Sequence, residues 1–182
     1  MERLEVPVFS HWTYILIGED KTGKTSFQRN LVSHLCGKRY AHLRRNIVTD
    51  IAHPRAPRGF ATIFTCNRSF QEKRSEYKSI RYYFKHFFKD ADVCVLSSHT
   101  RGKSAEEIAE MIRMLKRRCY NVGGVFWSNA FNDEAKDITL LPWNEILWLE
   151  NPTLSSSTEI SAQLDNIAKD FSELLIARAN VQ

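Results

Sequence analysis

The stretch from residue 18 to residue 25 constrains the fold of this chain more than any other feature. Its sequence, Gly-Glu-Asp-Lys-Thr-Gly-Lys-Thr, matches the pattern G-x-x-x-x-G-K-[ST]. An apolar run at residues 12–17 precedes it, and residues 24–36 follow with Phe27, Leu31 and Leu35 at the four-residue spacing of a helix's inner face. A strand, a glycine-containing turn and a helix N-terminus in this order predict a phosphate-binding loop.

The same alternation of apolar runs and amphipathic segments continues along the chain. Further strands are expected at residues 46–51, 60–66, 93–97, 123–128 and 145–149. Further helices are expected at residues 73–89, from residue 104 onward and at residues 156–175. This order predicts an α/β fold, with one P-loop NTPase domain over residues 1–182 and a mostly parallel sheet flanked by helices on both faces.

Several classes of protein are disfavoured by the sequence. The longest apolar runs, such as residues 14–17, fall far short of the ~20 residues of a membrane span, and no secretory signal is present, so we expect a cytoplasmic protein without a membrane span. The four cysteines are scattered without Cys-x-x-Cys spacing, and we interpret them as buried thiols. His11 and His99 have no ligand at metal-binding spacing in the sequence, so no metal site made of protein ligands alone is predicted.

The loop pattern assigns a chemical role to individual side chains. Its glycines permit tight turns in which successive N–H groups point inward, and the dipole of the following helix adds positive potential. Lys24 would reach the β and γ phosphates as a catalytic residue, Thr25 would bind Mg²⁺ through its hydroxyl oxygen, and Ser26 would contact the α phosphate. The predicted nucleotide-binding residues are Gly18, Glu19, Asp20, Lys21, Thr22, Gly23, Lys24, Thr25 and Ser26.

Later segments extend a resemblance to a known family. The stretches at 91–96 (ADVCVL), 122–129 (VGGVFWSN) and 149–152 (LENP) are similar to late strands and loops of the ParA/MinD ATPases, the deviant-Walker group of plasmid partition and cellular positioning. The resemblance implies that Asn129 contacts adenine and that Pro152 belongs to the purine-side loop. It also implies ATP with Mg²⁺, a nucleotide-dependent homodimer, and contact with DNA or a DNA-bound adaptor.

The chain also departs from that family's pattern. Glu19 occupies the position at which the family usually places a lysine, and Lys21 is either a substitute or a solvated loop residue. Asp50 approximates the family's second-strand acidic motif and is a candidate catalytic residue and Mg²⁺ ligand. Residues 60–67 contain no carboxylate, so we expect weak or absent ATP hydrolysis. GTP is less favoured, because residues 129–132 lack the lysine and aspartate of the guanine-reading N-K-x-D.

Charge is unevenly distributed along the chain. Residues 37–89 carry thirteen Lys and Arg against three acidic residues, a local net charge of +10, which leaves −5 for the remainder of a chain whose total is +5. Within this segment a basic stripe runs along the expected helix and consists of Arg74, Lys78, Arg81, Lys85 and Lys89. The stripe is either a solvated helix face or a contact for DNA phosphates or another acidic partner.

Two other functions remain open on the same scaffold. A small-molecule kinase would use the basic segment to hold an acidic acceptor. A non-hydrolysing scaffold subunit would bind nucleotide only for stability, which the absence of a third-strand aspartate supports.

Overall fold

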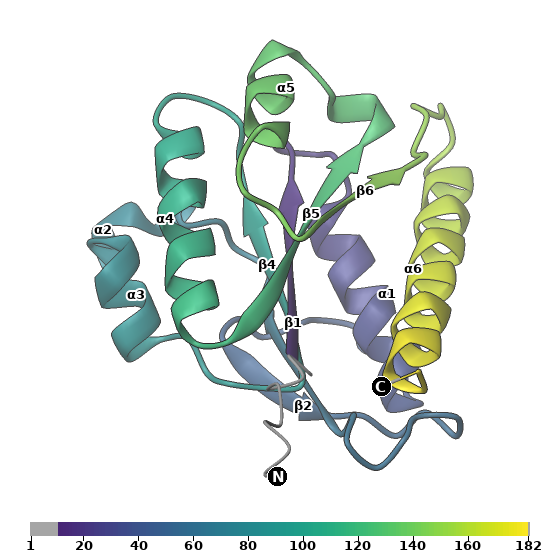
Figure 1. Cartoon of the computed structure of the whole chain (residues 1–182). Coiled ribbons are helices and arrows are strands. Elements are labelled where there is room, and N and C mark those ends of the chain that lie inside the picture. The colour runs from purple at the N-terminus through teal and green to yellow at the C-terminus, as the bar shows by residue number, and fades with distance from the viewer. Residues whose placement is uncertain (1–10, 182) are drawn as a thin grey trace, which may run out of the picture.

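The computed structural model describes residues 11–181 and contains one six-stranded sheet with helices on both faces (Figure 1). The strands are β1 (His11–Ile17), β2 (Ile47–Asp50), β3 (Thr62–Cys66), β4 (Val93–Ser98), β5 (Tyr120–Trp127) and β6 (Glu145–Leu149). The α-helices are α1 (Lys24–Cys36), α2 (Arg74–Tyr77), α3 (Ile80–His86), α4 (Ser104–Arg117), α5 (Asp133–Thr139) and α6 (Ser157–Ala179). Two short 3₁₀ turns, η1 (Gln71–Lys73) and η2 (Ser128–Ala130), complete the described elements.

The strands lie in the order β2-β3-β4-β1-β5-β6, and all neighbours are parallel except β2, which runs antiparallel to β3. The β2–β3 connection is the short Pro-rich stretch at residues 51–61, which contains no helix. A connection of this kind joins antiparallel neighbours, whereas the parallel pairs are joined by helical crossovers. The expected mostly parallel sheet is therefore confirmed.

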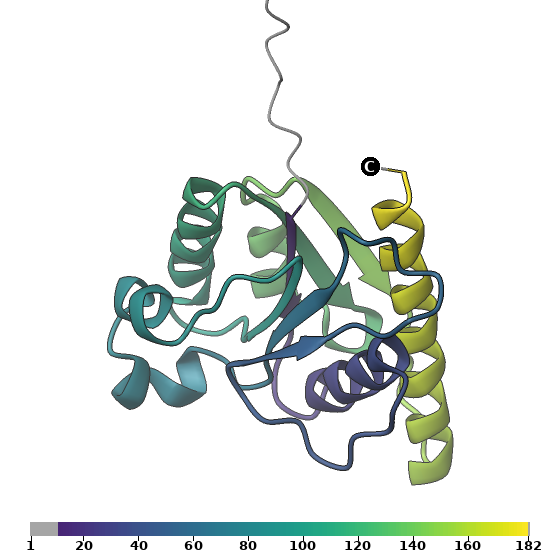
Figure 2. The same ribbon diagram turned by 90° about the horizontal axis from the view of Figure 1, so that it is seen from below.

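Alternating side chains of the sheet build two separate cores. Tyr14 and Leu16 of β1 point to one face, where they share a buried cluster with apolar residues of α1 and α6. Ile15 and Ile17 point to the other face and pack in a cluster with residues of α2, α3, α4 and α5. Figure 2 shows α1 and α6 on one side of the sheet and α2, α3 and α4 on the other. This alternation is the period-two pattern of a sheet buried on both faces, and it confirms helices on both sides.

The prediction of one continuous helix at residues 73–89 is wrong. In place of that helix, the structure has η1, α2 and α3, which together span residues 71–86. Lys78 has a positive φ of 59°, and Ser79 is in extended backbone with its side chain accepting a hydrogen bond from the Tyr82 N–H, so Ser79 caps a new helix. The apolar spacing continues across this break, which is why periodicity alone did not indicate it. The helix α5 was not expected from the sequence either.

The interpretation of the cysteines is confirmed for three of the four. Cys36, Cys66 and Cys94 are buried, whereas Cys119 is exposed in the turn after α4, where its φ is 63°. Burial raises the pKa of the Cys36 thiol to about 11 and of the Cys94 thiol to about 12, so both are protonated at neutral pH. These two buried thiols are therefore structural.

Candidate functional site

The topology directs five loops to one edge of the sheet. Because β1, β3, β4, β5 and β6 are parallel, their carboxyl ends lie at the same edge. The chain leaves β1 toward β2 on one side and later returns to β5 on the other side of β1. Ligands of open α/β sheets bind outside the carboxyl ends of the strands at such a switch point. The predicted loop at residues 18–26 follows β1 directly and therefore lies at this position.

The loop has the backbone that an anion cradle requires. Gly23 adopts a φ of +97° immediately before α1, and an added Cβ there would lie 2.7 Å from Cδ2 of Leu164. Only glycine meets both conditions without strain. No side chain caps the N-terminus of α1, so its first N–H groups remain available to an anion.

The side chain of Lys24 packs against the backbone of this loop. Its side chain is buried, with 8% of the residue exposed, and Nζ donates to the Gly18 carbonyl (2.5 Å), the Glu19 carbonyl (2.6 Å) and the Thr22 hydroxyl (3.3 Å). Burial lowers the pKa of Lys24 to about 8, against the opposing effect of the carboxylates of Glu72, Asp20 and Glu19. A bound polyanion would offer this ammonium a stronger partner than two neutral carbonyls.

The loop faces an open cleft with a volume of about 610 Å³. Residues 20–26 line it, and the opposite wall comes from the end of β3 and from α6. Among the described residues, the Thr25 hydroxyl makes one hydrogen bond, a long one of 3.4 Å to the Asn67 carbonyl. Lys21 lines the cleft and is exposed, so the structure places it at the mouth rather than against the loop backbone. The volume lies within the range of known small-molecule sites.

Glu19 turns away from the cleft. Its carboxylate accepts hydrogen bonds from the Thr100 N–H (2.9 Å) and hydroxyl (2.5 Å), and it pairs with the Arg101 guanidinium at 3.0 Å. Burial raises the pKa of Glu19, but the Thr100 hydrogen bonds and the Arg101 charge outweigh it and hold the pKa below its usual value. Glu19 therefore ties the loop at residues 18–26 to the loop after β4.

Two carboxylates and an imidazole meet beside Lys24. The side-chain ligand atoms of Asp20, Glu72 and His99 all lie within 4.8 Å of one another. His99 Nε2 is 3.4 Å from Asp20 Oδ1 and 3.9 Å from Glu72 Oε1, and the Ser69 N–H donates to Oε2 of Glu72. The sequence analysis gave neither Glu72 nor His99 a role. Glu72 lies on η1 beyond the end of β3, so no local pattern connects it with the phosphate loop.

Asp50 lies at the opposite edge of the sheet, and its prediction as catalytic residue and Mg²⁺ ligand is corrected. It pairs with Thr62 at the start of β3, whereas β3 ends at Cys66, four residues later, and only the next residue, Asn67, lines the cleft. At about 3.3 Å per residue, those four residues separate Asp50 from the cleft by roughly 13 Å. The physical reason is the antiparallel direction of β2, which points its carboxyl end away from the loop.

The two residues predicted on the base side lie at the same edge of the sheet as the loop at residues 18–26. Asn129 is exposed on η2 directly after β5, and Pro152 is exposed in the loop after β6. Between them lies the buried Asn151, which was not predicted: its side-chain amide donates to the Thr22 carbonyl (3.0 Å), and its N–H donates to the Ser128 hydroxyl (2.7 Å). Asn151 therefore fixes the loops after β5 and β6 against the phosphate loop.

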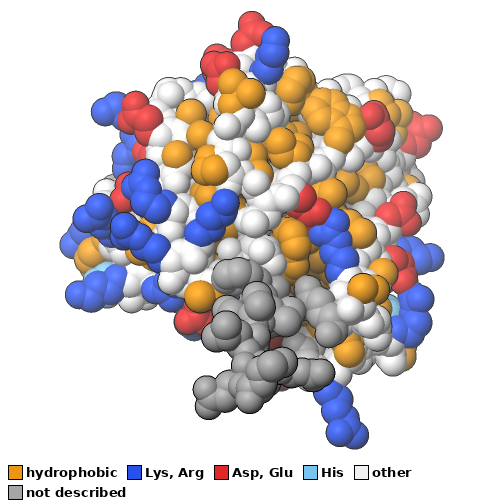
Figure 3. All heavy atoms as spheres, in the orientation of Figure 1, with side chains coloured by type: hydrophobic (Ala, Val, Ile, Leu, Met, Phe, Trp, Pro, Cys, Tyr) orange, Lys and Arg blue, Asp and Glu red, His pale blue; other side chains and the backbone are white. Residues whose placement is uncertain are grey.

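The basic stripe is interrupted by ion pairs. Arg74 pairs with Glu107 at 2.6 Å and Arg81 pairs with Glu110 at 3.2 Å, so α4 offsets two of its five charges. The other three members, Lys78, Lys85 and Lys89, are exposed. The neighbouring α4 adds its own exposed cations, which are Arg113, Lys116 and Arg117. Figure 3 shows Lys and Arg side chains gathered on the flank of α3 and α4. The stripe is thus part of a wider basic flank.

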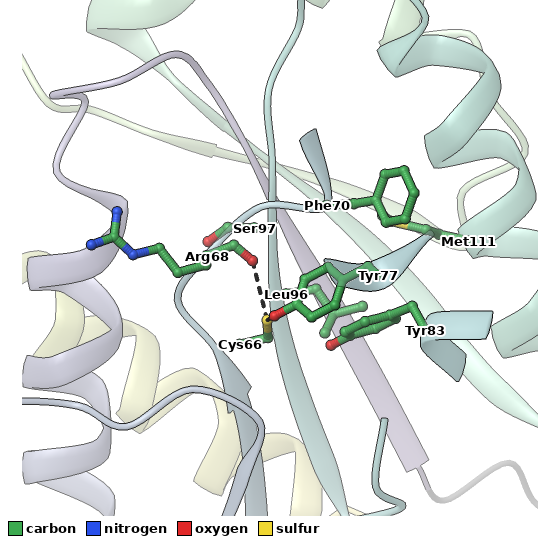
Figure 4. A pocket seen from close by; sticks show the side chains of 8 residues that line it. All are labelled: Cys66, Arg68, Phe70, Tyr77, Tyr83, Leu96, Ser97 and Met111. Atoms are coloured by element: carbon green, nitrogen blue, oxygen red, sulfur yellow. Dashed lines mark hydrogen bonds between the residues drawn. The ribbon is translucent and has the colours of Figure 1, made fainter. Parts of the chain in front are cut away.

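A small buried pocket lies behind the cleft but offers no room for a ligand. Figure 4 shows Cys66, Tyr77 and Tyr83 facing one another, with the Cys66 thiol donating to the Arg68 carbonyl at 3.1 Å. The pocket's volume of about 10 Å³ suffices for one water molecule at most. Arg68 links both sites, because its carbonyl meets Cys66 and its side chain extends toward α1, where the residue lines the cleft.

Comparison with models of known protein families and with curated proteins gives no match to this chain. Among residues 11–181, no helix has the length and apolar character that crossing a membrane requires.

Proposed function

We propose that this chain is a P-loop nucleotide-binding protein that takes ATP with Mg²⁺ and works as a nucleotide-dependent switch of the ParA/MinD type. The main support for the proposal is the geometry of the loop at residues 18–26. Uncapped N–H groups of α1, the positive φ of Gly23 and the buried ammonium of Lys24 converge at the switch point of the sheet.

The cleft fits a triphosphate chemically. Lys24 is held by neutral carbonyl and hydroxyl oxygens, which it can exchange for phosphate oxygens without leaving an unpaired carboxylate. Asn129 and Pro152 follow β5 and β6 at the same edge as the loop, which supports a base site beside the phosphates.

The residues around the loop also fit Mg²⁺, which prefers oxygen ligands. The donors are the Thr25 hydroxyl, which has one long hydrogen bond, and the carboxylates of Asp20 and Glu72. When bound, Mg²⁺ would neutralise phosphate charge next to these carboxylates. In this proposal Glu72 takes the part that the sequence analysis gave to Asp50. Because β3 itself ends without a carboxylate, we expect slow hydrolysis.

We further propose that the basic flank of α3 and α4 contacts DNA phosphates and that ATP promotes a homodimer. Exposed cations on two packed helices supply sequence-independent affinity that falls with salt. The ion pairs of Arg74 and Arg81 leave Lys85 and Lys89, with Arg113 and Arg117 of α4, as the main phosphate contacts.

The switch is tested by size-exclusion chromatography with light scattering, with and without ATP and Mg²⁺, followed by DNA binding at two salt concentrations. We expect a doubling of mass with ATP and tighter, salt-sensitive DNA binding by the dimer. Unchanged mass together with absent DNA binding would refute the switch. Radiolabelled ATP turnover, alone and with DNA, then separates a slow ATPase from a non-hydrolysing scaffold, which would bind ATP without turnover.

A further inference from the structure

A second cleft lies next to the phosphate loop and is equally large. It lies between α1, the loop at residues 37–41 and the first turns of α6, and its volume is about 640 Å³. Thr25 and Ser26 line the first cleft, and Arg29 and Asn30, one helical turn further along α1, line the second. One turn is about 5.4 Å, so the two clefts are neighbours on one helix.

The second cleft carries excess positive charge. Arg29, Lys38 and Arg39 line it, and none of the three forms a salt bridge with a carboxylate within residues 11–181. The cleft's one carboxylate, Asp165, is 3.0 Å from His34 Nε2 and is therefore already engaged. By contrast, the arginines beside the first cleft, Arg68 and Arg101, are both paired with glutamates.

Within residues 11–181, two of these cations, Arg29 and Lys38, make weak contacts with neighbouring groups. Arg29 donates to the Ala41 carbonyl at 3.5 Å, the limit of a hydrogen bond, and Lys38 Nζ lies 5.3 Å from the ring centroid of Tyr40. These contacts position the charges without neutralising them. The charges are therefore available to an anion.

The walls of the cleft are fixed by hydrogen bonds. The Ser33 hydroxyl donates to the Arg29 carbonyl (2.8 Å) and accepts from the Tyr40 N–H (3.2 Å), which anchors the loop to α1. The His34–Asp165 contact joins α1 to α6, and the two helices also share a buried apolar core. A site with preset walls loses less entropy on binding.

The remaining lining is polar and suits an anion with hydrogen-bond acceptors. Asn30, Thr158 and Ser161 contribute an amide and two hydroxyls. Thr158 is the second residue of α6, so the positive end of that helix dipole also borders the cleft. Arginines with hydroxyl and amide donors match the planar and tetrahedral oxygens of phosphate groups.

We propose that this cleft is a second anion site, which binds a phosphorylated small molecule beside the nucleotide. The site goes beyond the nucleotide switch, and its existence does not depend on that switch. It would serve equally as a regulatory site or as the acceptor site of a small-molecule kinase, because both ligands would lie along α1.

The test uses histidine side chains as local reporters in a two-dimensional NMR titration with inorganic pyrophosphate at constant pH. His34 borders the second cleft, and His99 lies beside the phosphate loop. We expect both resonances to shift in the parent chain. In Lys24→Ala the His34 response should persist while that of His99 weakens, which separates this site from the nucleotide site. In Arg39→Gln the affinity reported by His34 should fall roughly tenfold, the loss of one charge-assisted contact.

The matched control is Arg58→Gln, which removes an exposed arginine that does not line the cleft. Its His34 titration should equal that of the parent. The proposal is overturned if His34 does not respond to millimolar pyrophosphate, if its response disappears with Lys24→Ala, or if Arg58→Gln weakens it as much as Arg39→Gln. A His34 response to duplex oligonucleotide but not to pyrophosphate would also overturn it, in favour of a nucleic-acid surface.

Discussion

Substituting Gly23 with alanine perturbs the phosphate loop at the point where its backbone is most demanding. The φ of +97° costs a residue with a Cβ about 1–3 kcal/mol. The added Cβ would also lie 2.7 Å from Cδ2 and 3.0 Å from Cδ1 of Leu164, which is buried in the core shared by α1 and α6. Overpacking of this kind costs roughly another 1–3 kcal/mol. We therefore expect Gly23→Ala to lose about 2–6 kcal/mol of unfolding free energy.

Urea unfolding followed by tryptophan fluorescence measures this loss, and calorimetry with ATP measures its consequence for binding. Gly59→Ala is the matched control, because an added Cβ there meets nothing within 4 Å and the backbone φ is not in the positive range. Its stability should change by no more than about 0.5 kcal/mol. The reasoning is refuted if Gly23→Ala is as stable as Gly59→Ala and binds ATP with parental affinity.

Three further predictions concern the pKa of Lys24, the carboxylate of Glu72 and the basic flank of α3 and α4. The pKa of Lys24 is about 8 in the folded chain against a usual 10.5, so the unfolded chain binds more protons between these values. The free energy of unfolding should therefore rise between pH 8 and pH 10 in urea titrations, and Lys24→Met should flatten that rise. If the slope of unfolding free energy against pH is the same in the variant, the burial of the Lys24 ammonium is contradicted. Glu72→Gln should weaken Mg²⁺-dependent ATP binding roughly tenfold in calorimetry, whereas Asp50→Asn should leave it unchanged. If Asp50→Asn weakens this binding and Glu72→Gln does not, Asp50 and not Glu72 belongs to the site. The double variant Lys85→Gln, Arg117→Gln should lower the slope of log affinity for duplex DNA against log salt by about 2, and an unaltered slope would exclude this flank.

The local structure around residues 18–26 was predictable because its signal is local. Residues 12–36 contain the strand, the glycines and the helix that together make the cradle, and the structure forms all three where the pattern indicates. The strands of the sheet were predictable for the same reason, because each of them coincides with an apolar run in the sequence. The break at Lys78 was missed because a positive φ leaves no trace in apolar spacing, and only Ser79 offered a capping signal.

The acidic part of the site could not be predicted from local pattern. Asp50 was chosen because it approximates the second-strand acidic motif of the ParA/MinD family, but the direction of β2 depends on its pairing with β3, which is a long-range property. Glu72 and His99 come next to Asp20 only because β3 and β4 end at the same edge as β1. The ion pairs of Arg74 and Arg81 could not be predicted either, because their partners lie on α4, far away in the sequence.

Isothermal titration calorimetry of the folded chain with ATP and Mg²⁺, repeated with GTP and with the Lys24→Ala variant, tests the central claim most directly. We expect one ATP site, weaker binding of GTP, and loss of binding in Lys24→Ala, while Lys21→Ala, at an exposed position, retains most of it. Absence of heat with both nucleotides, or parental binding by Lys24→Ala, would contradict the assignment of residues 18–26 as a phosphate cradle.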